Sequence, residues 1–304
     1  MENIIVTNNL CKKYGKFQAL DNVSITIKKG GIYGLIGKNG AGKTTLLRVI
    51  SGLQNLTSGK YSLFGVDYKD KNITKQRRKV GAIIEKPSIY LDMSATENLK
   101  QQCLILGIPN FDDILKILKL VGLDNAGKKP AKNFSLGMKQ RLGIAIALVG
   151  NPDFIILDEP INGLDPQGII EIRELILKLN KEFGITFLIS SHILDELSKV
   201  ATDFYFINNG KVIKEINSKE LSTICKKITQ IEVDDVKIAS SILTTEIINF
   251  DVISDTQIDI YSNIVLSELI SKLSKENCTV ISSTIKNESL ESYFLNLIGG
   301  EDND

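Results

Sequence analysis

A glycine-rich segment between two apolar segments constrains the fold of this chain more than any other feature. Residues 37–45 read Gly-Lys-Asn-Gly-Ala-Gly-Lys-Thr-Thr. The run before them, Ile32 to Ile36, is short, apolar and β-rich, which predicts a buried strand. After them, apolar residues recur with helical spacing at Leu46, Leu47, Val49 and Ile50. The sequence therefore predicts a strand, a tight loop and a helix in that order, which is an α/β arrangement.

The residue types of this loop suit the binding of a nucleotide and Mg²⁺. Glycines let the backbone curl so that consecutive N–H groups face a polyphosphate at the positive end of the helix. Lys43 can then meet the terminal phosphates, and the Thr44 hydroxyl can ligate Mg²⁺. The residues predicted to line this site are Gly37, Lys38, Asn39, Gly40, Ala41, Gly42, Lys43, Thr44 and Thr45.

A second buried strand is predicted over Phe154 to Leu157, and it ends in the acidic pair Asp158 and Glu159. The carboxyl ends of strands form the edge at which α/β sheets bind ligands. Asp158 suits a role in holding Mg²⁺, usually through water, and Glu159 suits a general base that polarises the attacking water. The alternative is a polar strand end without a chemical role.

Asp165 and His192 are candidate site residues that also have structural explanations. Asp165 can cap a helix that starts at Pro166, and capping alone would explain it. His192 is the only histidine and follows another predicted buried strand, which ends at Ser190. Its imidazole can donate to a γ-phosphate and help to keep Glu159 and water aligned, whereas a lone histidine at a helix start is usually structural.

The octet Phe134 to Arg141 adds a second surface that suits an anion. Ser135 is a good N-cap and Gly137 permits close backbone approach, while the residues that follow have helical character. The positive end of that helix would be offered to phosphate. One chain cannot easily present both this surface and the phosphate loop to one nucleotide.

Taken in order, these motifs resemble those of the ATP-binding subunit of ABC transporters, over roughly residues 2 to 216. The set comprises an aromatic loop at Tyr14, Walker A at Gly37 to Thr45, the signature octet, Walker B ending at Asp158 and Glu159, the D-loop at 162–166 and the H-loop at His192. Tyr14 offers a ring that can stack on adenine, although a tyrosine there is more often a strand-packing residue.

The resemblance implies both a fold and a working assembly. The fold is a P-loop NTPase with a RecA-like core, an antiparallel β-subdomain and an α-helical subdomain. The activity is hydrolysis of ATP with Mg²⁺, in two composite sites where the Ser135 and Gly137 surface of one subunit closes over ATP held by another. We therefore expect a homodimer or pseudo-dimer that acts on a separate membrane permease, at the cytoplasmic face of the cell membrane.

Two departures from the usual family pattern narrow the class. The octet has Phe134, Leu136 and Met138 where Leu, Gly and Gln are usual, and Glu85 stands where the Q-loop normally has glutamine. Both departures resemble the branch that includes bacitracin-resistance and lantibiotic-immunity exporters. Glu85 is accordingly a candidate to approach nucleotide, Mg²⁺ or water, and the alternative is a plain surface glutamate.

Charge and cysteine content exclude other classes. The chain has 37 Lys and Arg against 36 Asp and Glu, so its net charge of +1 gives no case for a nucleic-acid partner attracted by bulk charge. The four cysteines form no C-x-x-C pair, which favours isolated thiols over a disulfide framework. We see neither a secretory signal nor a run long enough to span a membrane.

The composition changes after residue 216, so we expect a nucleotide-binding domain over 1–216 and an accessory domain over 217–304. The second segment reads strand, helix, strand, strand, helix, strand, which a small ferredoxin-like α+β domain would satisfy, and a terminal helix is expected over 288–294.

Two rival functions stay open: a soluble ABC-type ATPase switch on a ribosome or DNA, and a sensor that binds ATP without cycling. The segment between Glu85 and the octet predicts the helical subdomain, with a capping box at Ser94 to Glu97 and a second amphipathic helix over Asp112 to Val121.

Overall fold

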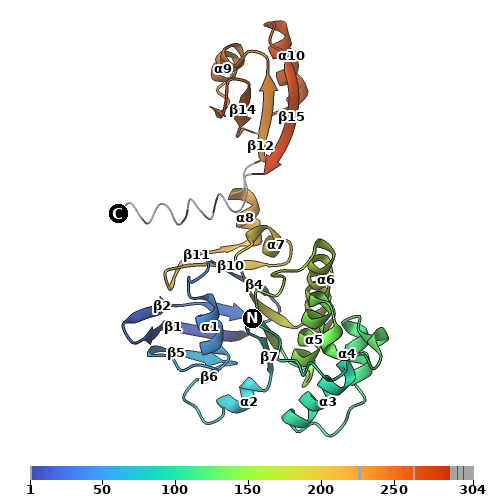
Figure 1. Cartoon of the computed structure of the whole chain (residues 1–304). Helices are drawn as coiled ribbons and strands as arrows, with labels where there is room; N and C mark the ends of the chain where they lie inside the picture. The colour runs from blue at the N-terminus through green and yellow to red at the C-terminus, as the bar shows by residue number, and fades with distance from the viewer. Residues whose placement is uncertain (1, 225–226, 263, 288–292, 294–296, 298–304) are drawn as a thin grey trace. The chain divides into compact units, whose positions relative to one another are not determined.

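The computed structural model divides the chain into two compact units, Met1–Ser218 and Lys219–Asp304, and each is described by itself (Figure 1). The structure describes residues 2–224, 227–262, 264–287, 293 and 297. The division falls two residues beyond the boundary expected from composition, and the terminal helix expected over 288–294 lies outside the described residues except at Tyr293.

A six-stranded sheet forms the centre of the first unit. Its order is β11-β10-β4-β9-β8-β7, in which β11 alone is antiparallel to its neighbour. The strands are β4 (Ile32–Ile36), β7 (Val80–Ile83), β8 (Phe154–Asp158), β9 (Thr186–Ser191), β10 (Asp203–Asn208) and β11 (Lys211–Asn217). Every residue of β4, β8 and β9 is buried, as expected for parallel strands that are covered on both faces. Their carboxyl ends meet at one edge and carry the predicted site.

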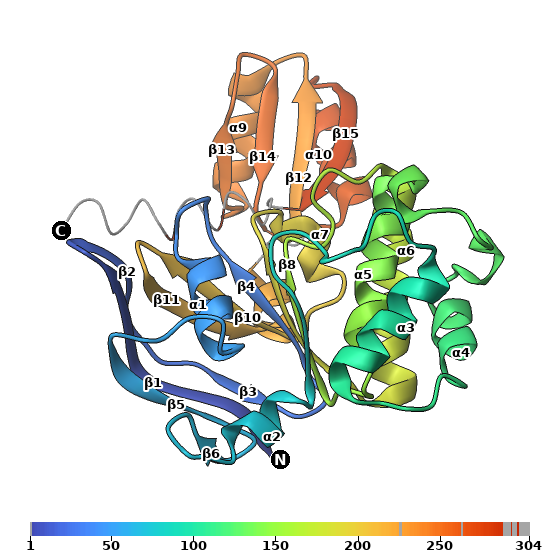
Figure 2. The ribbon, with the colours of Figure 1, turned by 60° about the horizontal axis from the view of Figure 1, so that its bottom comes forward.

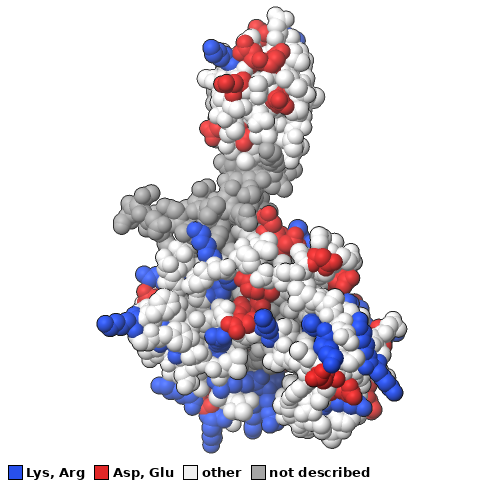
Figure 3. All heavy atoms as spheres, in the orientation of Figure 1, with Lys and Arg blue, Asp and Glu red and all other residues white. Residues whose placement is uncertain are grey.

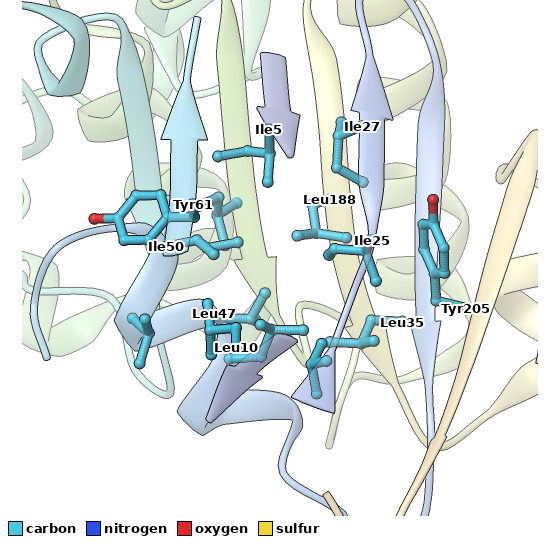
Figure 4. Packing of buried hydrophobic residues seen from close by; sticks show 14 of the residues in the cluster. Ile5, Leu10, Ile25, Ile27, Leu35, Leu47, Ile50, Tyr61, Leu188 and Tyr205 are labelled. Carbon is cyan, nitrogen blue, oxygen red and sulfur yellow. The ribbon is translucent and has the colours of Figure 1, made fainter. Parts of the chain in front are cut away.

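A second, antiparallel sheet packs against the first. Its strands are β1 (Asn3–Tyr14), β2 (Phe17–Val23), β3 (Thr26–Lys28), β5 (Ser58–Leu63) and β6 (Val66–Asp67). The path is β2-β1-β5-β6, and β3 also pairs with β1. Side chains of this sheet, of the helix α1 (Lys43–Ile50) and of the central sheet share one core, in which Leu10, Leu47 and Leu188 are fully buried (Figure 4). This core fixes the helix that follows the phosphate loop.

The remaining helices of the first unit are α2 (Ile73–Arg77), α3 (Ala95–Leu106), α4 (Ile114–Leu120), α5 (Leu136–Leu148), α6 (Pro166–Phe183) and α7 (Leu194–Ser198), with short 3₁₀ turns at Asp124–Ala126 and Ala131–Asn133. Figures 1 and 2 show α3 to α6 on one side of the central sheet and the antiparallel sheet on the other. The capping box predicted at the start of α3 is present, because the Ser94 and Glu97 side chains each bond the other's backbone N–H. The helices α3 and α4 lie in the segment predicted to form the helical subdomain.

The second unit begins within α8 (Ser218–Ile224), and the elements after this helix have the predicted order. It consists of β12 (Lys227–Val233), α9 (Val236–Thr245), β13 (Phe250–Val252), β14 (Gln257–Ile260), α10 (Leu266–Lys275) and β15 (Val280–Asn287). The antiparallel order β13-β14-β12-β15 and the β-α-β-β-α-β sequence are those of ferredoxin-like folds. Ile231, Ile258, Leu243 and Leu273 share its own small core.

The described cysteines are isolated thiols. Cys11, Cys103 and Cys278 are buried and free, and Cys225 lies outside the described residues. Burial raises the pKa of the Cys103 and Cys278 thiols, so little of the reactive thiolate forms at neutral pH. Cys103 and Cys278 therefore serve packing rather than redox chemistry.

Candidate active site

The loop at residues 37–42 joins β4 to α1 and requires glycine at specific places. Gly40 and Gly42 have φ angles of 84° and 108°, in the left-handed region. A Cβ atom on Gly37 would lie 2.5 Å from the carbonyl oxygen of Ile207, and one on Gly42 would lie 2.7 Å from that of Ala19. No side chain caps α1, so the N–H groups of its first turn stay available to an anion.

Lys43 is the buried cation of the site. Its side chain is 6% exposed, and its ammonium donates to the carbonyl oxygens of Gly37 at 2.6 Å and Lys38 at 3.3 Å. The same nitrogen lies 3.3 Å from Oε1 of Glu159. The ammonium is thus held within the curve of the loop by oxygen atoms, which phosphate oxygens can replace.

Asp158 links the loop helix to the centre of the sheet. The Thr44 hydroxyl donates to Oδ2 of Asp158 at 2.8 Å, and the Ser190 hydroxyl donates to Oδ1 in a short hydrogen bond. Asp158 is 2% exposed, so its buried carboxylate oxygens accept hydrogen bonds from these protein donors. One carboxylate and one hydroxyl are the protein ligands that suit Mg²⁺ when phosphates and water complete its octahedron. Within the described part of the chain, no three His, Cys, Asp or Glu residues gather to hold a metal alone.

Glu159 follows at the end of β8 with a φ of 50°, a left-handed angle that turns its carboxylate toward both Lys43 and His192. Its backbone N–H donates to the Ser190 hydroxyl at 3.0 Å. Its Oε2 is 2.7 Å from Nδ1 of His192, which must carry the proton for that hydrogen bond. Its Oε1 is buried and accepts no hydrogen bond, because Lys43 lies near enough for an ion pair but is not aligned for a hydrogen bond. That oxygen is available to accept a proton from water.

Ser190 was not predicted from the sequence, although its hydroxyl contacts both acidic residues. It is fully buried in β9 between Asp158 and the backbone of Glu159. The signal that would have found it is a hydroxyl directly after the apolar run Phe187 to Ile189, at the end of the strand.

Ser190→Ala is expected to lower the ATPase turnover by about tenfold to a hundredfold, since it removes a hydrogen bond to a buried charge that is worth about 1.5–3 kcal/mol. The nucleotide affinity should change little, because Lys43 and the loop are untouched. Steady-state phosphate release and ATP titration measure the two effects. Ser191→Ala is the matched control, because that hydroxyl bonds the backbone of Ile193 and neither carboxylate. An equal loss of turnover in both variants would mean that the Ser190 hydroxyl has no specific role in the site.

The signature residues lie at the start of α5, as the sequence predicted. Ser135 is its N-cap and accepts from the N–H of Met138 at 3.2 Å. The space around Gly137 is open, because a Cβ atom added there would lie 3.9 Å from Leu164, its nearest neighbour. Asp165 caps α6 by accepting from Gly168 at 3.1 Å, so its capping role is observed. In the described part of the chain, no hydrogen bond or ion pair joins Ser135 to the phosphate loop of the same chain.

Glu85 lies after β7, and Arg48 of α1 is the side chain that binds it. The guanidinium is 2.7 Å from Oε1 of Glu85, which has a φ of 65° and is exposed. Two residues further on, Pro87 packs against Gly143 of α5 so tightly that a Cβ on Gly143 would lie 2.6 Å from it. The segment is therefore attached to both α1 and α5. Arg48 was not predicted, because nothing in the sequence joins residues that are 37 positions apart.

Glu85→Gln and Arg48→Gln are expected to have the same effect, since each removes the one ion pair. The free energy of unfolding should fall by no more than about 1 kcal/mol, because the pair is exposed to solvent. We expect ATPase activity to persist and its coupling to transport to change. Thermal melts, phosphate release and an antibiotic-resistance assay separate these effects, and an unchanged resistance assay would make Glu85 a bystander.

Tyr14 lies at the end of β1 and is 41% exposed, with the Lys12 ammonium 5.0 Å from its ring centroid. Phe17 pairs with it across the β1–β2 hairpin and is 64% exposed. Tyr14 is thus an accessible ring rather than a buried packing residue, and Phe17 is a second exposed ring that was not predicted from the sequence.

The parallel sheet, the glycine loop and the acidic strand end define a P-loop nucleotide-binding protein. The family model for the ABC transporter matches residues 20–162. The chain is 42% identical to the bacitracin transport ATP-binding protein BcrA of Bacillus licheniformis, over 99% of each chain. It is 48% identical to the lantibiotic transport ATP-binding protein SrtF of Streptococcus pyogenes, over 68% of this chain and 88% of that protein. The chain therefore belongs to the ATP-binding protein family of ABC transporters, which are ATPases.

Solved structures agree with this assignment. An ATP-binding cassette of an ABC transporter in its ADP conformation has a TM-score of 0.66 and 30% identity, covering 72% of this chain and 93% of that one. A dimeric cassette in a post-hydrolysis state, bound to ADP and phosphate, has a TM-score of 0.63 and 27% identity, over 71% and 99% of the two chains. The predicted P-loop fold with mixed α/β content is confirmed.

Proposed function

We propose that this protein is the ATP-hydrolysing motor subunit of an exporter that expels antimicrobial peptides, either lantibiotics or bacitracin-like antibiotics. The observation that carries the proposal is the arrangement of Glu159, which His192 and Lys43 hold in place while one buried carboxylate oxygen accepts no hydrogen bond. Such an oxygen is positioned to take the proton of an attacking water. The names of the relatives supply the cargo class.

Each site residue receives a role in this proposal. The loop from Gly37 to Thr45 binds the phosphates of ATP, and Tyr14 stacks on the base. Thr44 and Asp158 hold Mg²⁺, whose other ligands would be phosphate and water oxygens. Glu85, which forms an ion pair with Arg48 in the structure, is the further candidate for contact with nucleotide, Mg²⁺ or water.

The working unit in this proposal is a dimer that acts on a separate membrane permease. Ser135 and Gly137 present the start of α5 to the nucleotide held by a second copy, with Asp165 beside them, and the open space at Gly137 permits that approach. The described helices include none with the length and apolar content of a membrane-spanning segment. In this proposal a permease holds the protein at the cytoplasmic face of the membrane, and the second unit supports the dimer or regulates it.

Deletion of the gene tests the proposed function. We expect the deletion strain to become more sensitive to a lantibiotic or to bacitracin, and the intact gene to restore resistance. A gene carrying Glu159→Gln should fail to restore it, while Glu174→Gln, an exposed glutamate of α6 outside the site, should succeed. Unchanged sensitivity to both classes of antibiotic, with normal ATPase activity of the purified protein, would favour the rival function of a soluble switch or sensor.

A further inference from the structure

The balanced net charge of the chain conceals one strongly basic segment. Residues 69–79 contain six Lys and Arg and one acidic residue, whereas the whole chain has 37 basic and 36 acidic residues. Lysine and arginine side chains gather at the lower edge of the first unit in Figure 3, where Figure 1 places β6 and α2. We call the exposed members of this segment the basic surface: Lys69, Lys71, Lys75, Arg78 and Lys79.

The charges of the basic surface are not neutralised within the protein. None of its five members forms an ion pair with a carboxylate among the described residues. The one acidic residue of the segment, Asp70, accepts from the backbone N–H of Asn72 at 2.7 Å, which makes a turn. Lysines elsewhere in the first unit do find carboxylates, for example Lys132 with Asp92 and Lys199 with Glu196.

The segment that carries the basic surface is packed against the main core of the first unit. Ile73 is 7% exposed and anchors α2 in the main core. Arg77, the sixth basic residue, is half-buried; it donates to the Tyr61 hydroxyl at 2.9 Å and packs against Gly52. Leu53, next to Gly52, is 70% exposed. A large exposed apolar side chain therefore follows the glycine that Arg77 contacts, and basic residues together with such a side chain are typical of surfaces that meet the lipid–water interface.

We propose that the basic surface binds the anionic headgroups of the membrane in which the permease lies. This inference rests on the proposed function, which brings the protein to a membrane. The five cations lie on a turn, on a short helix and before a strand. Because they are spread over several elements, they suit an array of repeated phosphates better than one compact ligand. Clusters of this size bind anionic lipid by simple attraction, and each cation near the surface adds to the affinity. Lipid contact orients the motor beneath its permease.

Sedimentation with vesicles tests the proposal. We expect the full chain to bind vesicles of phosphatidylglycerol and phosphatidylcholine in equal parts, and not vesicles of phosphatidylcholine alone. Binding should disappear at about 0.5 M NaCl, where the Debye length is only about 4 Å. The variant Lys69→Gln/Lys71→Gln/Lys75→Gln/Arg78→Gln should bind the anionic vesicles at least about tenfold more weakly. Its ATPase activity should be unchanged, because none of these residues belongs to the site.

The matched control removes the same charge from other exposed positions of the first unit: Lys119→Gln/Lys128→Gln/Lys178→Gln/Lys181→Gln. This control should bind vesicles almost as the natural chain does. Equal losses in both variants would show a bulk-charge effect and overturn the proposal. A second outcome would also overturn the proposal: the first variant binds vesicles as the natural chain does, but permease in phosphatidylcholine nanodiscs no longer captures it. The partner of the basic surface would then be an acidic protein segment. The vesicles contain no permease, so this experiment measures lipid binding separately from transport. A failure of the lipid proposal can therefore be told apart from a failure of the proposed transport function.

Discussion

Glu159→Gln is expected to bind Mg·ATP with nearly unchanged affinity and to hydrolyse it at least about a hundredfold more slowly, in line with the contribution of a general base. Glutamine keeps the size of the side chain and can still accept from His192, but it cannot take a proton from water. The phosphate loop and Lys43 remain in place. Phosphate release measures the turnover, and a fluorescent nucleotide measures binding.

The same variant tests the composite site, because the proposed dimer, closed by two ATP molecules, would reopen only after hydrolysis. We expect Glu159→Gln to elute as a dimer on size exclusion in Mg·ATP and as a monomer without nucleotide. Glu174→Gln is the matched control and should behave as the natural chain does. A Glu159→Gln protein that stays monomeric in Mg·ATP would contradict the pairing of Ser135 with a second copy, and full turnover would contradict the base.

The parts of the site that the sequence predicted are those that depend on the pattern of neighbouring residues along the chain. Glycines, a lysine and a threonine between an apolar run and a helical run specify the loop, because each element depends on neighbours in the chain. The position of the acidic pair followed for the same reason: the run of four apolar residues from Phe154 to Leu157 predicted a buried strand, and in the structure β8 ends at Asp158. The element order of the second unit also followed from alternation and turn residues.

The parts that the sequence did not predict depend on contacts between distant segments. Ser190 acts on Asp158 because β9 pairs with β8 in a register that sets these two residues opposite each other. Arg48 reaches Glu85 because α1 lies beside the segment after β7. The basic surface was likewise missed, since whole-chain charge says nothing about where charges gather. Short edge strands such as β6, with two residues, leave too little pattern to detect.

Lys43→Ala is expected to weaken ATP binding at least about a hundredfold, because a charged hydrogen-bond donor worth about 3 kcal/mol is lost from the phosphates. The variant should still fold, since alanine suits the first turn of a helix and the carbonyl oxygens of Gly37 and Lys38 can turn to water. Equilibrium titration with a fluorescent ATP analogue measures the affinity, and a thermal melt confirms the fold.

Lys38→Ala is the control that separates charge from position. Its side chain is exposed, and its observed contact with Lys43 is made by its backbone carbonyl, which the substitution leaves in place. We expect its ATP affinity to stay within a few-fold of the natural value, because the general attraction of one exposed cation is screened. Equal losses in the two variants would mean that the loop attracts phosphate through overall charge. A loss confined to Lys43→Ala would mean that the buried ammonium, held at one point in the curve of the loop, is what recognises the nucleotide.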